Sequence, residues 1–145
     1  DEVYDRLDAC FASGAQWNLT PGWDPHLKDG WNGEDFTILE PSGRIRPNFR
    51  PRPYPRATAG LPTRFAFHRG TTLGRPSRLE YDWIQHPDRG ETEIYVPRSV
   101  FPPGFPVTVI LLFFGFPGIL RDESRQLLLI HTDRPTALSL RAFGH

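Results

Sequence analysis

The sequence predicts a mainly β protein, in which a terminal β/α element of a parallel domain is followed by an antiparallel β-sandwich. Two observations predict this class. The 145 residues include 16 prolines and 13 glycines, which favour turns over long helices, while a hydrophobic content of 38% argues against disorder. Short runs of alternating polar and apolar residues fill the second half of the chain, as in strands with one buried face.

The first 40 residues are predicted to form one helix, one strand and a long polar loop. Apolar residues recur at helical spacing within residues 1–13: Val3, Leu7, Cys10 and Phe11. Gly14 predicts the end of this helix, and residues 15–19 are the strand candidate. This is the order of one step in a parallel barrel or sheet, and no later segment repeats it. Residues 1–40 are therefore expected to be the end of a domain whose body is missing.

Residues 41–62 contain six of the 16 prolines and predict an extended connector. Residues 63–145 then predict a sandwich, because six short strand candidates are separated by turn signals. The candidates are 63–67, 78–84, 92–96, 107–114, 126–131 and 136–142. The most apolar, 107–114, is too short to span a bilayer and is expected to be a buried strand, with a lipid-facing edge as the alternative.

Charge is divided between neighbouring blocks, although the net charge is zero. Residues 1–40 hold nine acids and two bases, whereas residues 41–79 hold nine arginines and no acid. Such blocks indicate either two structural units that face one another or a basic face for an anionic partner. We expect the arginines to pair with acids of the first unit and to cap carbonyls. A nucleic-acid partner is not expected, since the chain has a single lysine and no aromatic-rich binding sheet.

Three of the four tryptophans stand within a stretch that otherwise reads as turn and loop, residues 14–35. They are Trp17, Trp23 and Trp31, and their neighbours are Asn, Asp, Glu and Gly. Indole rings stack on the C–H faces of sugars, while amides and carboxylates bind sugar hydroxyls, so the stretch is typical of a sugar site. The alternative is that these aromatics only cover a loop.

Other sites are disfavoured by the residues present. The single cysteine, Cys10, excludes an internal disulfide, and the five histidines show no metal-ligand spacing, so no metal or other cofactor is expected. Adjacent Glu34 and Asp35 cannot be a catalytic pair, because neighbouring side chains point apart. Position 1 is not methionine and no signal-peptide pattern follows, so we expect the chain to begin after cleavage or to be a piece of something longer.

Three stretches together resemble glycoside hydrolase family 5, in the branch of the endoglycoceramidases and the related fungal glucosylceramide and steryl-glucoside hydrolases. "SGAQWNLTP" followed by "DGWNGEDFTI" resembles the last barrel strand and its loop. "RPYPRATAG" is similar to the segment that leads from the barrel into the C-terminal domain, and "TEIYVPRSVFPPG" to a strand and turn of that domain. The resemblance covers about residues 1–110. It implies the end of a (β/α)8 TIM barrel in residues 1–40, the connector in 41–62 and a C-terminal β-sandwich in 63–145.

The resemblance also implies a function. Family members are retaining glycosidases whose two catalytic glutamates follow the fourth and seventh barrel strands. Neither is in this chain, which opens in the helix after the seventh strand, so it contributes no catalytic residue and is expected to be inactive alone. Trp17 matches the tryptophan that forms part of the platform under the cleaved sugar. The full set of candidate substrate-binding residues is Trp17, Asn18, Trp23, Asp29 and Trp31.

The expected partners follow from the same resemblance. They are a companion chain or missing N-terminal segment that completes the barrel, and a glycolipid or oligosaccharide substrate. The resemblance allows the sandwich to form part of a lipid-facing surface. It allows both secreted and intracellular enzymes, so the location is left open, with secretion slightly favoured. The alternative interpretation is a free-standing carbohydrate-binding β-sandwich without catalysis. A third interpretation is a purely structural or interaction domain.

Overall fold

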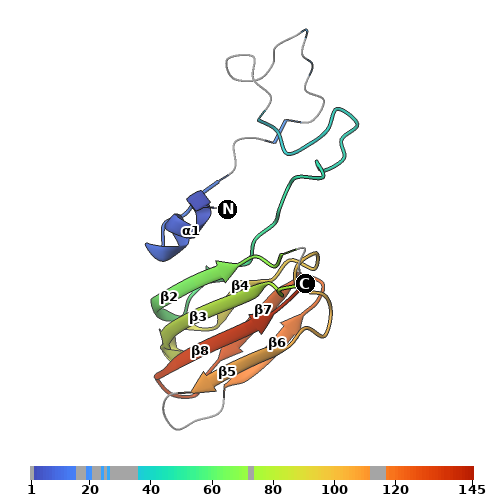
Figure 1. The fold of residues 1–145 in the computed structure, drawn as a ribbon. Coiled ribbons are helices and arrows are strands. Elements are labelled where there is room, and N and C mark those ends of the chain that lie inside the picture. Colours follow the sequence, from blue (N-terminus) through green and yellow to red (C-terminus); the bar gives the residue numbers. More distant parts are fainter. Residues whose placement is uncertain are drawn as a thin grey trace. The chain divides into compact units, whose positions relative to one another are not determined.

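A computed structural model describes residues 2–15, 19, 20, 24, 26, 36–71, 74–111 and 117–145. By their contacts these residues form two compact units. The larger consists of residues 1–13 and 51–145 and holds the helix α1 (Glu2–Ala9) and all eight strands (Figure 1). Residues 14–50 form the smaller unit, where the described part has one isolated bridge between Leu39 and Ile45.

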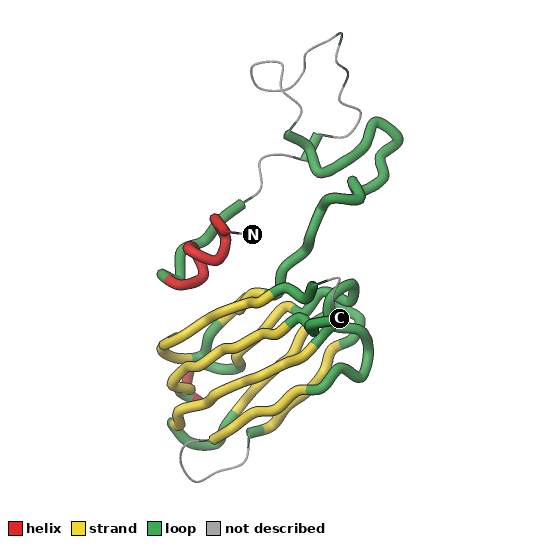
Figure 2. Tube along the Cα trace, viewed as in Figure 1, coloured by secondary structure: helices red, strands yellow, loops and turns green. Residues whose placement is uncertain are grey.

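The larger unit is an antiparallel β-sandwich, as predicted (Figure 2). One sheet has the strand order β1-β4-β7-β6 and the other β2-β3-β8-β5. The strands are β1 (Tyr54–Ala57), β2 (Gly60–His68), β3 (Arg78–Gln85), β4 (Thr92–Tyr95), β5 (Val107–Leu111), β6 (Gly118–Asp122), β7 (Leu127–His131) and β8 (Thr136–Phe143). A single 3-10 turn, Pro87–Arg89, lies between β3 and β4.

All six strands predicted for residues 63–145 are present, as β2, β3, β4, β5, β7 and β8. Of the strand candidate 15–19, residues 16–18 lie outside the described residues, so it stays a prediction. The two that the sequence did not predict, β1 and β6, are both edge strands. β1 lies inside the predicted connector and contains Pro55, which an edge strand tolerates because one side of its backbone needs no partner. The connector is thus partly regular structure.

β5 corrects a second expectation, that residues 107–114 form a buried strand. It is an edge strand of five residues, with Val107, Val109 and Leu111 against the core and Ile110 exposed on the other face. The remainder of that run lies outside the described residues. A strand with one face in the core and one edge unpaired is only half buried.

The helix is shorter than the predicted span and uses a different face. It ends at Ala9 rather than near Gly14, because Phe11 adopts a left-handed backbone conformation with φ of 55°. Of the predicted apolar stripe, Val3 and Phe11 are exposed and Leu7 is half-buried. The contacts of α1 instead involve Tyr4, Asp5 and Asp8, described below.

The core lies between the two sheets, where the inward side chains of both meet. β3 contributes Leu79, Tyr81 and Trp83, and Trp83 stacks on Tyr81 with a ring-centroid distance of 4.7 Å and an interplanar angle of 16°. Other core residues include Phe65, Phe67, Ile94, Phe101, Phe105, Leu128, Ile130, Leu138, Leu140 and Ala142. The fourth tryptophan, Trp83, is therefore structural.

Buried polar groups at one end of the core hold the sheets together. The Gln85 side chain accepts hydrogen bonds from Trp83 Nε1 and Thr92 Oγ1, both at 2.6 Å. Its amide nitrogen donates to the carbonyl oxygens of Gly90 and Ile130, at 3.2 and 3.5 Å. Because β3 belongs to one sheet and β4 and β7 to the other, Gln85 joins the two sheets.

Gly60, at the corner between β1 and β2, is required by close approach. Its φ is 150°, and a Cβ there would overlap the carbonyl oxygen of Ile84. Only glycine lets the chain cross from one sheet to the other this near β3. This accounts for the final residue of the "RPYPRATAG" stretch.

We predict that Gln85→Leu lowers the free energy of unfolding by about 2–4 kcal/mol, because it leaves buried donors of Trp83 and Thr92 without their acceptor. Denaturant unfolding measures this. Thr136→Val is the matched control, since Thr136 Oγ1 is buried and has no hydrogen-bond partner among the described residues. Its removal is expected to leave stability unchanged or slightly higher. Equal losses in both variants would contradict the role of the Gln85 network.

Candidate functional site

The residues predicted to bind sugar lie outside the part of the chain that the structure describes. They are Trp17, Asn18, Trp23, Asp29 and Trp31, and the same holds for Glu34 and Asp35. Their roles stay predictions. The described residues instead show two charged arrangements in the larger unit, one at α1 and one on a sheet face.

Arg52, just before β1, binds the helix. Its Nη2 lies 2.7 Å from Asp5 Oδ1 and 2.7 Å from Asp8 Oδ2, and its side chain is only 11% exposed. The guanidinium also lies over two aromatic rings, 5.7 Å from the centroid of Tyr4 and 5.1 Å from that of Phe67. The Arg52 contact, formed by these five residues, thus joins α1 to the inner face of β2.

A second arginine shares the Phe67 ring. Arg69 lies 5.2 Å from the ring centroid and donates a hydrogen bond to the carbonyl oxygen of Pro51. Burial, together with the charge of Arg52, lowers the pKa of Arg69. Burial raises the pKa of Asp8 more than the hydrogen bond from Arg52 lowers it. The partly desolvated setting strengthens charge pairing here relative to a solvent-exposed pair.

The Arg52 contact confirms one sequence expectation, that an arginine of the basic block pairs with acids of residues 1–40. The sequence did not indicate which arginine. Asp5 and Asp8 are three positions apart, which places both carboxylates on one helix face and is the signal for a single shared cation. Arg56, Arg64 and Arg78 depart from the expectation, because their partners are acids of the sandwich itself.

We predict that Arg52→Met releases α1, because a thioether keeps much of the packing but cannot pair with two carboxylates. Hydrogen exchange of the amides of residues 2–9 is expected to become much faster, while that of β3 and β8 stays slow. The exposed Arg75 gives the control, and Arg75→Met is expected to change neither. Unaltered protection of α1 in Arg52→Met would show that the contact does not hold the helix.

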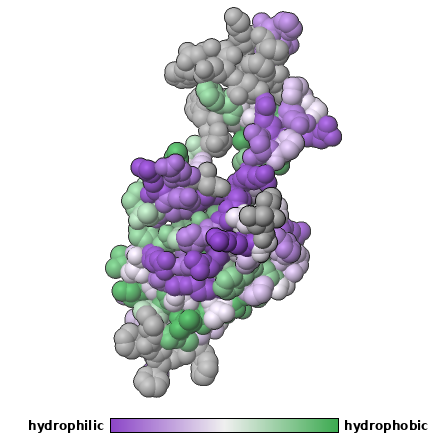
Figure 3. Space-filling model, in the orientation of Figure 1, coloured by the Kyte–Doolittle hydropathy of each residue, from purple (hydrophilic) through white to green (hydrophobic). Residues whose placement is uncertain are grey.

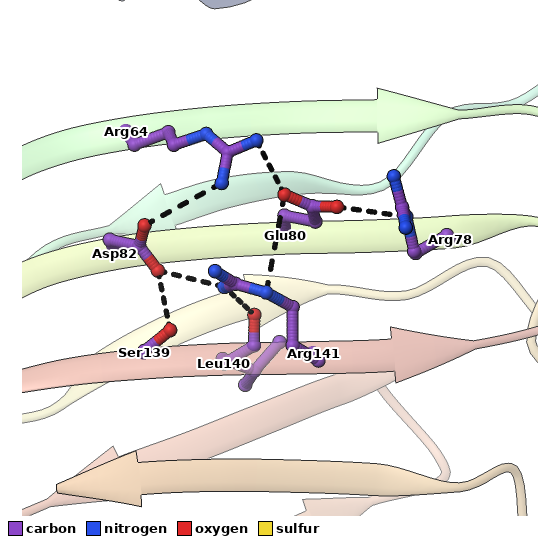
Figure 4. Close-up of polar contacts among 7 residues, drawn as sticks. All are labelled: Arg64, Arg78, Glu80, Asp82, Ser139, Leu140 and Arg141. Atoms are coloured by element: carbon purple, nitrogen blue, oxygen red, sulfur yellow. Dashed lines mark hydrogen bonds and ion pairs between the residues drawn. The ribbon is translucent and has the colours of Figure 1, made fainter.

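The outer face of the β2-β3-β8-β5 sheet carries the second arrangement (Figure 4). Glu80 lies at its centre with a side chain 7% exposed, 2.6 Å from Arg64 Nη2 and 2.8 Å from Arg78 Nε. Asp82 lies 2.7 Å from Arg141 Nη1 and accepts a hydrogen bond from Ser139 Oγ at 2.7 Å. Figure 3 shows the hydrophilic character of the middle of this face.

This charged face does not resemble an acid/base site. Burial by itself raises the pKa of Asp82, but the hydrogen bonds from Arg141 and Ser139, with the charge of Arg64, outweigh it and hold the pKa below its ordinary value of 3.8. A catalytic acid needs a raised pKa and access to substrate, whereas both carboxylates here are bound by arginines. The arrangement forms a polar surface of paired charges.

Asp82 predicts a pH dependence of stability. Because its pKa is lowered in the folded state, ionised Asp82 stabilises the fold above the unfolded pKa, and that contribution is lost as pH falls through the folded pKa. Asp82→Asn is therefore expected to lower the free energy of unfolding by about 1 kcal/mol at neutral pH and to have little effect in strong acid. Unfolding at several pH values, with exposed Asp88→Asn as control, measures this. A pH-independent difference would contradict it.

Two further findings concern the described residues. They contain no group of three or more His, Cys, Asp and Glu side chains arranged to hold a metal ion. They also contain no helix with the length and apolar character needed to cross a lipid bilayer.

Comparison with known proteins gives the family. The profile of the glycoside hydrolase family 5 C-terminal domain matches residues 52–139, more than half of the chain. The chain belongs to this family. The match begins at Arg52 and covers β1 through the first half of β8. No curated protein sequence matches the chain significantly.

The fold of this family 5 domain is similar to part of the crystal structure of Cryptococcus neoformans sterylglucosidase 1. The TM-score is 0.63 at 22% identity, and the similarity covers 98% of this chain but 23% of the sterylglucosidase. At this identity the likeness shows the fold alone. The chain thus spans about a quarter of the length of the solved relative.

The two stretches that best mark the domain are neighbours in space. "RPYPRATAG" contains β1 and "TEIYVPRSVFPPG" begins with β4, and these strands pair antiparallel. Tyr54 lies opposite Tyr95, and Ala57 opposite Glu93. These two stretches of the predicted resemblance therefore lie side by side at one sheet edge.

Proposed function

We propose that the chain is the C-terminal part of a retaining β-glycosidase that hydrolyses glycolipids such as glycosylceramides or steryl glucosides. The main support for this proposal is the match to the family. The chain also covers only 23% of the length of the similar sterylglucosidase, as a C-terminal part of a larger enzyme would. The name of the sterylglucosidase says that it acts on the glucoside of a sterol, which is a lipid. The sequence resemblance favours the same class of substrate for this chain. No cofactor is required by this chemistry.

In this proposal α1 is the helix that follows the seventh strand of a barrel, as its place at the start of the chain implies. The sandwich holds this helix in position. The Arg52 contact supports that role, because it ties a helix at the start of the chain to strands more than 40 residues later. A salt bridge with little exposure and two aromatic neighbours restrains a helix better than exposed ion pairs do. The domain would then keep the eighth barrel strand in place.

The mechanism is double displacement through a covalent glycosyl-enzyme intermediate, with both catalytic glutamates supplied by the barrel outside this chain. Trp17 would stack on the sugar whose bond is cleaved, and Asn18, Asp29 and Trp31 would line the mouth of the site. Trp23 would reach a second sugar or the lipid portion. Stacking orients the sugar ring but supplies no proton or nucleophile, so the chain alone would be inactive.

Peripheral membrane contact belongs to the same proposal. The edge strands β5 and β6 expose Ile110, Ile119 and Leu120, and the five residues of β5 include no charge. An uncharged edge strand is usually covered by something. A glycolipid substrate in a membrane gives the enzyme a reason to place such an edge at the lipid surface.

Native mass spectrometry of the protein purified from its source tests the proposal first. We expect a companion of about 250–350 residues, either continuous with this chain or bound to it, which is the size that completes a barrel. That preparation is expected to hydrolyse glucosylceramide or a steryl glucoside. A folded 16.6 kDa monomer with no companion and no hydrolysis would overturn the proposal.

In the active preparation, Trp17→Ala is expected to lower kcat/KM about two- to tenfold through loss of stacking, and Trp17→Phe to retain most activity. Hydrolysis of a fluorescent glucosylceramide measures both. Since the two variants differ only in the aromatic ring, an equal loss in both would point to misfolding, and no loss in either would remove Trp17 from the site.

A further inference from the structure

An exposed aromatic pair lies on the outer face of the β1-β4-β7-β6 sheet. Tyr54 and Tyr95 are opposite one another in the β1–β4 ladder, with ring centroids 5.2 Å apart and planes inclined by 41°. Their neighbour Ile94 points into the core, so Tyr95 points outward by the alternation of a strand. Tyr54 is 50% exposed, and Tyr95 is half-buried. Together they present an aromatic surface to solvent.

Polar groups adjoin the pair on the same face. Glu93, two positions before Tyr95, lies 3.4 Å from Arg56 Nε and 3.7 Å from Arg125 Nη2. Among the described residues the Glu93 carboxylate accepts no direct hydrogen bond, and these distances are too long for strong ones. Its carboxylate therefore keeps capacity to accept hydrogen bonds from a ligand, and the two guanidinium groups can donate.

The charges around the pair are balanced. Arg125 also lies 3.7 Å from Asp122, so two arginines face two carboxylates. Burial and the neighbouring Tyr54 raise the pKa of Tyr95, so its phenol is neutral and can both donate and accept. A nucleic acid or sulfated glycan would need an excess of positive charge. Aromatic faces beside neutral and paired polar groups match the C–H faces and hydroxyls of an uncharged sugar.

We propose that Tyr54, Tyr95 and Glu93, with Arg56 and Arg125, form an accessory binding site for a neutral oligosaccharide. The inclined rings suit a chain whose successive sugars turn relative to one another, rather than one flat surface. Cross-strand packing alone accounts for the contact between the two rings. It does not account for the exposure of the Tyr54 ring, or for the adjacent Glu93 carboxylate that accepts no hydrogen bond among the described residues. This site does not depend on the proposed hydrolysis, and none of its residues belongs to the predicted Trp17 site.

Isothermal titration calorimetry of the 145-residue chain with cellotetraose and laminaritetraose tests the site, with a heparin tetrasaccharide as the anionic comparison. We expect at least one neutral tetrasaccharide to bind and the anionic one not to bind. Tyr54→Ala is expected to weaken binding about two- to tenfold, and Tyr54→Phe to leave it nearly unchanged. Phe143→Ala, which removes an exposed aromatic from the other sheet, is expected to have no effect.

Trp17→Ala separates this site from the proposed catalytic one. Binding that survives Trp17→Ala and falls in Tyr54→Ala supports the accessory site, whatever the outcome of the hydrolysis assays. Three results would overturn it: no binding of either neutral tetrasaccharide, binding only of the heparin fragment, or binding that is lost in Trp17→Ala and kept in Tyr54→Ala. Circular dichroism melting of each variant confirms that the chain is folded in every comparison.

Discussion

The stacking of Trp83 on Tyr81 at the centre of β3 is the contact on which both sheets depend. Each ring also has a polar atom that must be satisfied when buried. The Tyr81 hydroxyl shares a hydrogen bond of 2.5 Å with Thr58, and Trp83 Nε1 donates to Gln85. Burial raises the pKa of Tyr81 to about 12, so the hydroxyl stays protonated. Two aromatic side chains on one strand thereby connect the β1–β2 corner, β4 and β7.

Charged groups border this core in two places, at α1 and on the outer face of β3. Arg52 contacts Phe67, itself a core residue, and so couples α1 to the interior rather than to the surface alone. On the outer face of β3, Glu80 is buried by the arginines around it, since no layer of the described larger unit covers that side with apolar residues. Charge pairing replaces hydrophobic covering there, which costs desolvation but leaves the surface polar.

The two sheets carry different surface features. One carries the charged face and, through β2, the Arg52 contact, which would brace the barrel in the proposed glycosidase. The other carries the family stretches at its β1–β4 edge and the aromatic pair. The charged face and the aromatic pair lie on the outer faces of different sheets, so the two proposed roles, bracing and sugar binding, would use different residues.

The sequence by itself determined the sandwich, the presence of a helix at the start of the chain and the family, because these are local properties. Alternation along a strand reports which face is apolar, whatever strand lies beside it. The tertiary structure alone decided that Arg52 meets Asp5, 47 residues away, that Arg141 meets Asp82, 59 residues away, and that Tyr54 lies opposite Tyr95. Strand order brings these residues together, and no local pattern encodes strand order. The edge strands β1 and β6 escaped prediction for a related reason: their short, Pro- or Gly-containing sequences are strands only because β4 and β7 supply partners.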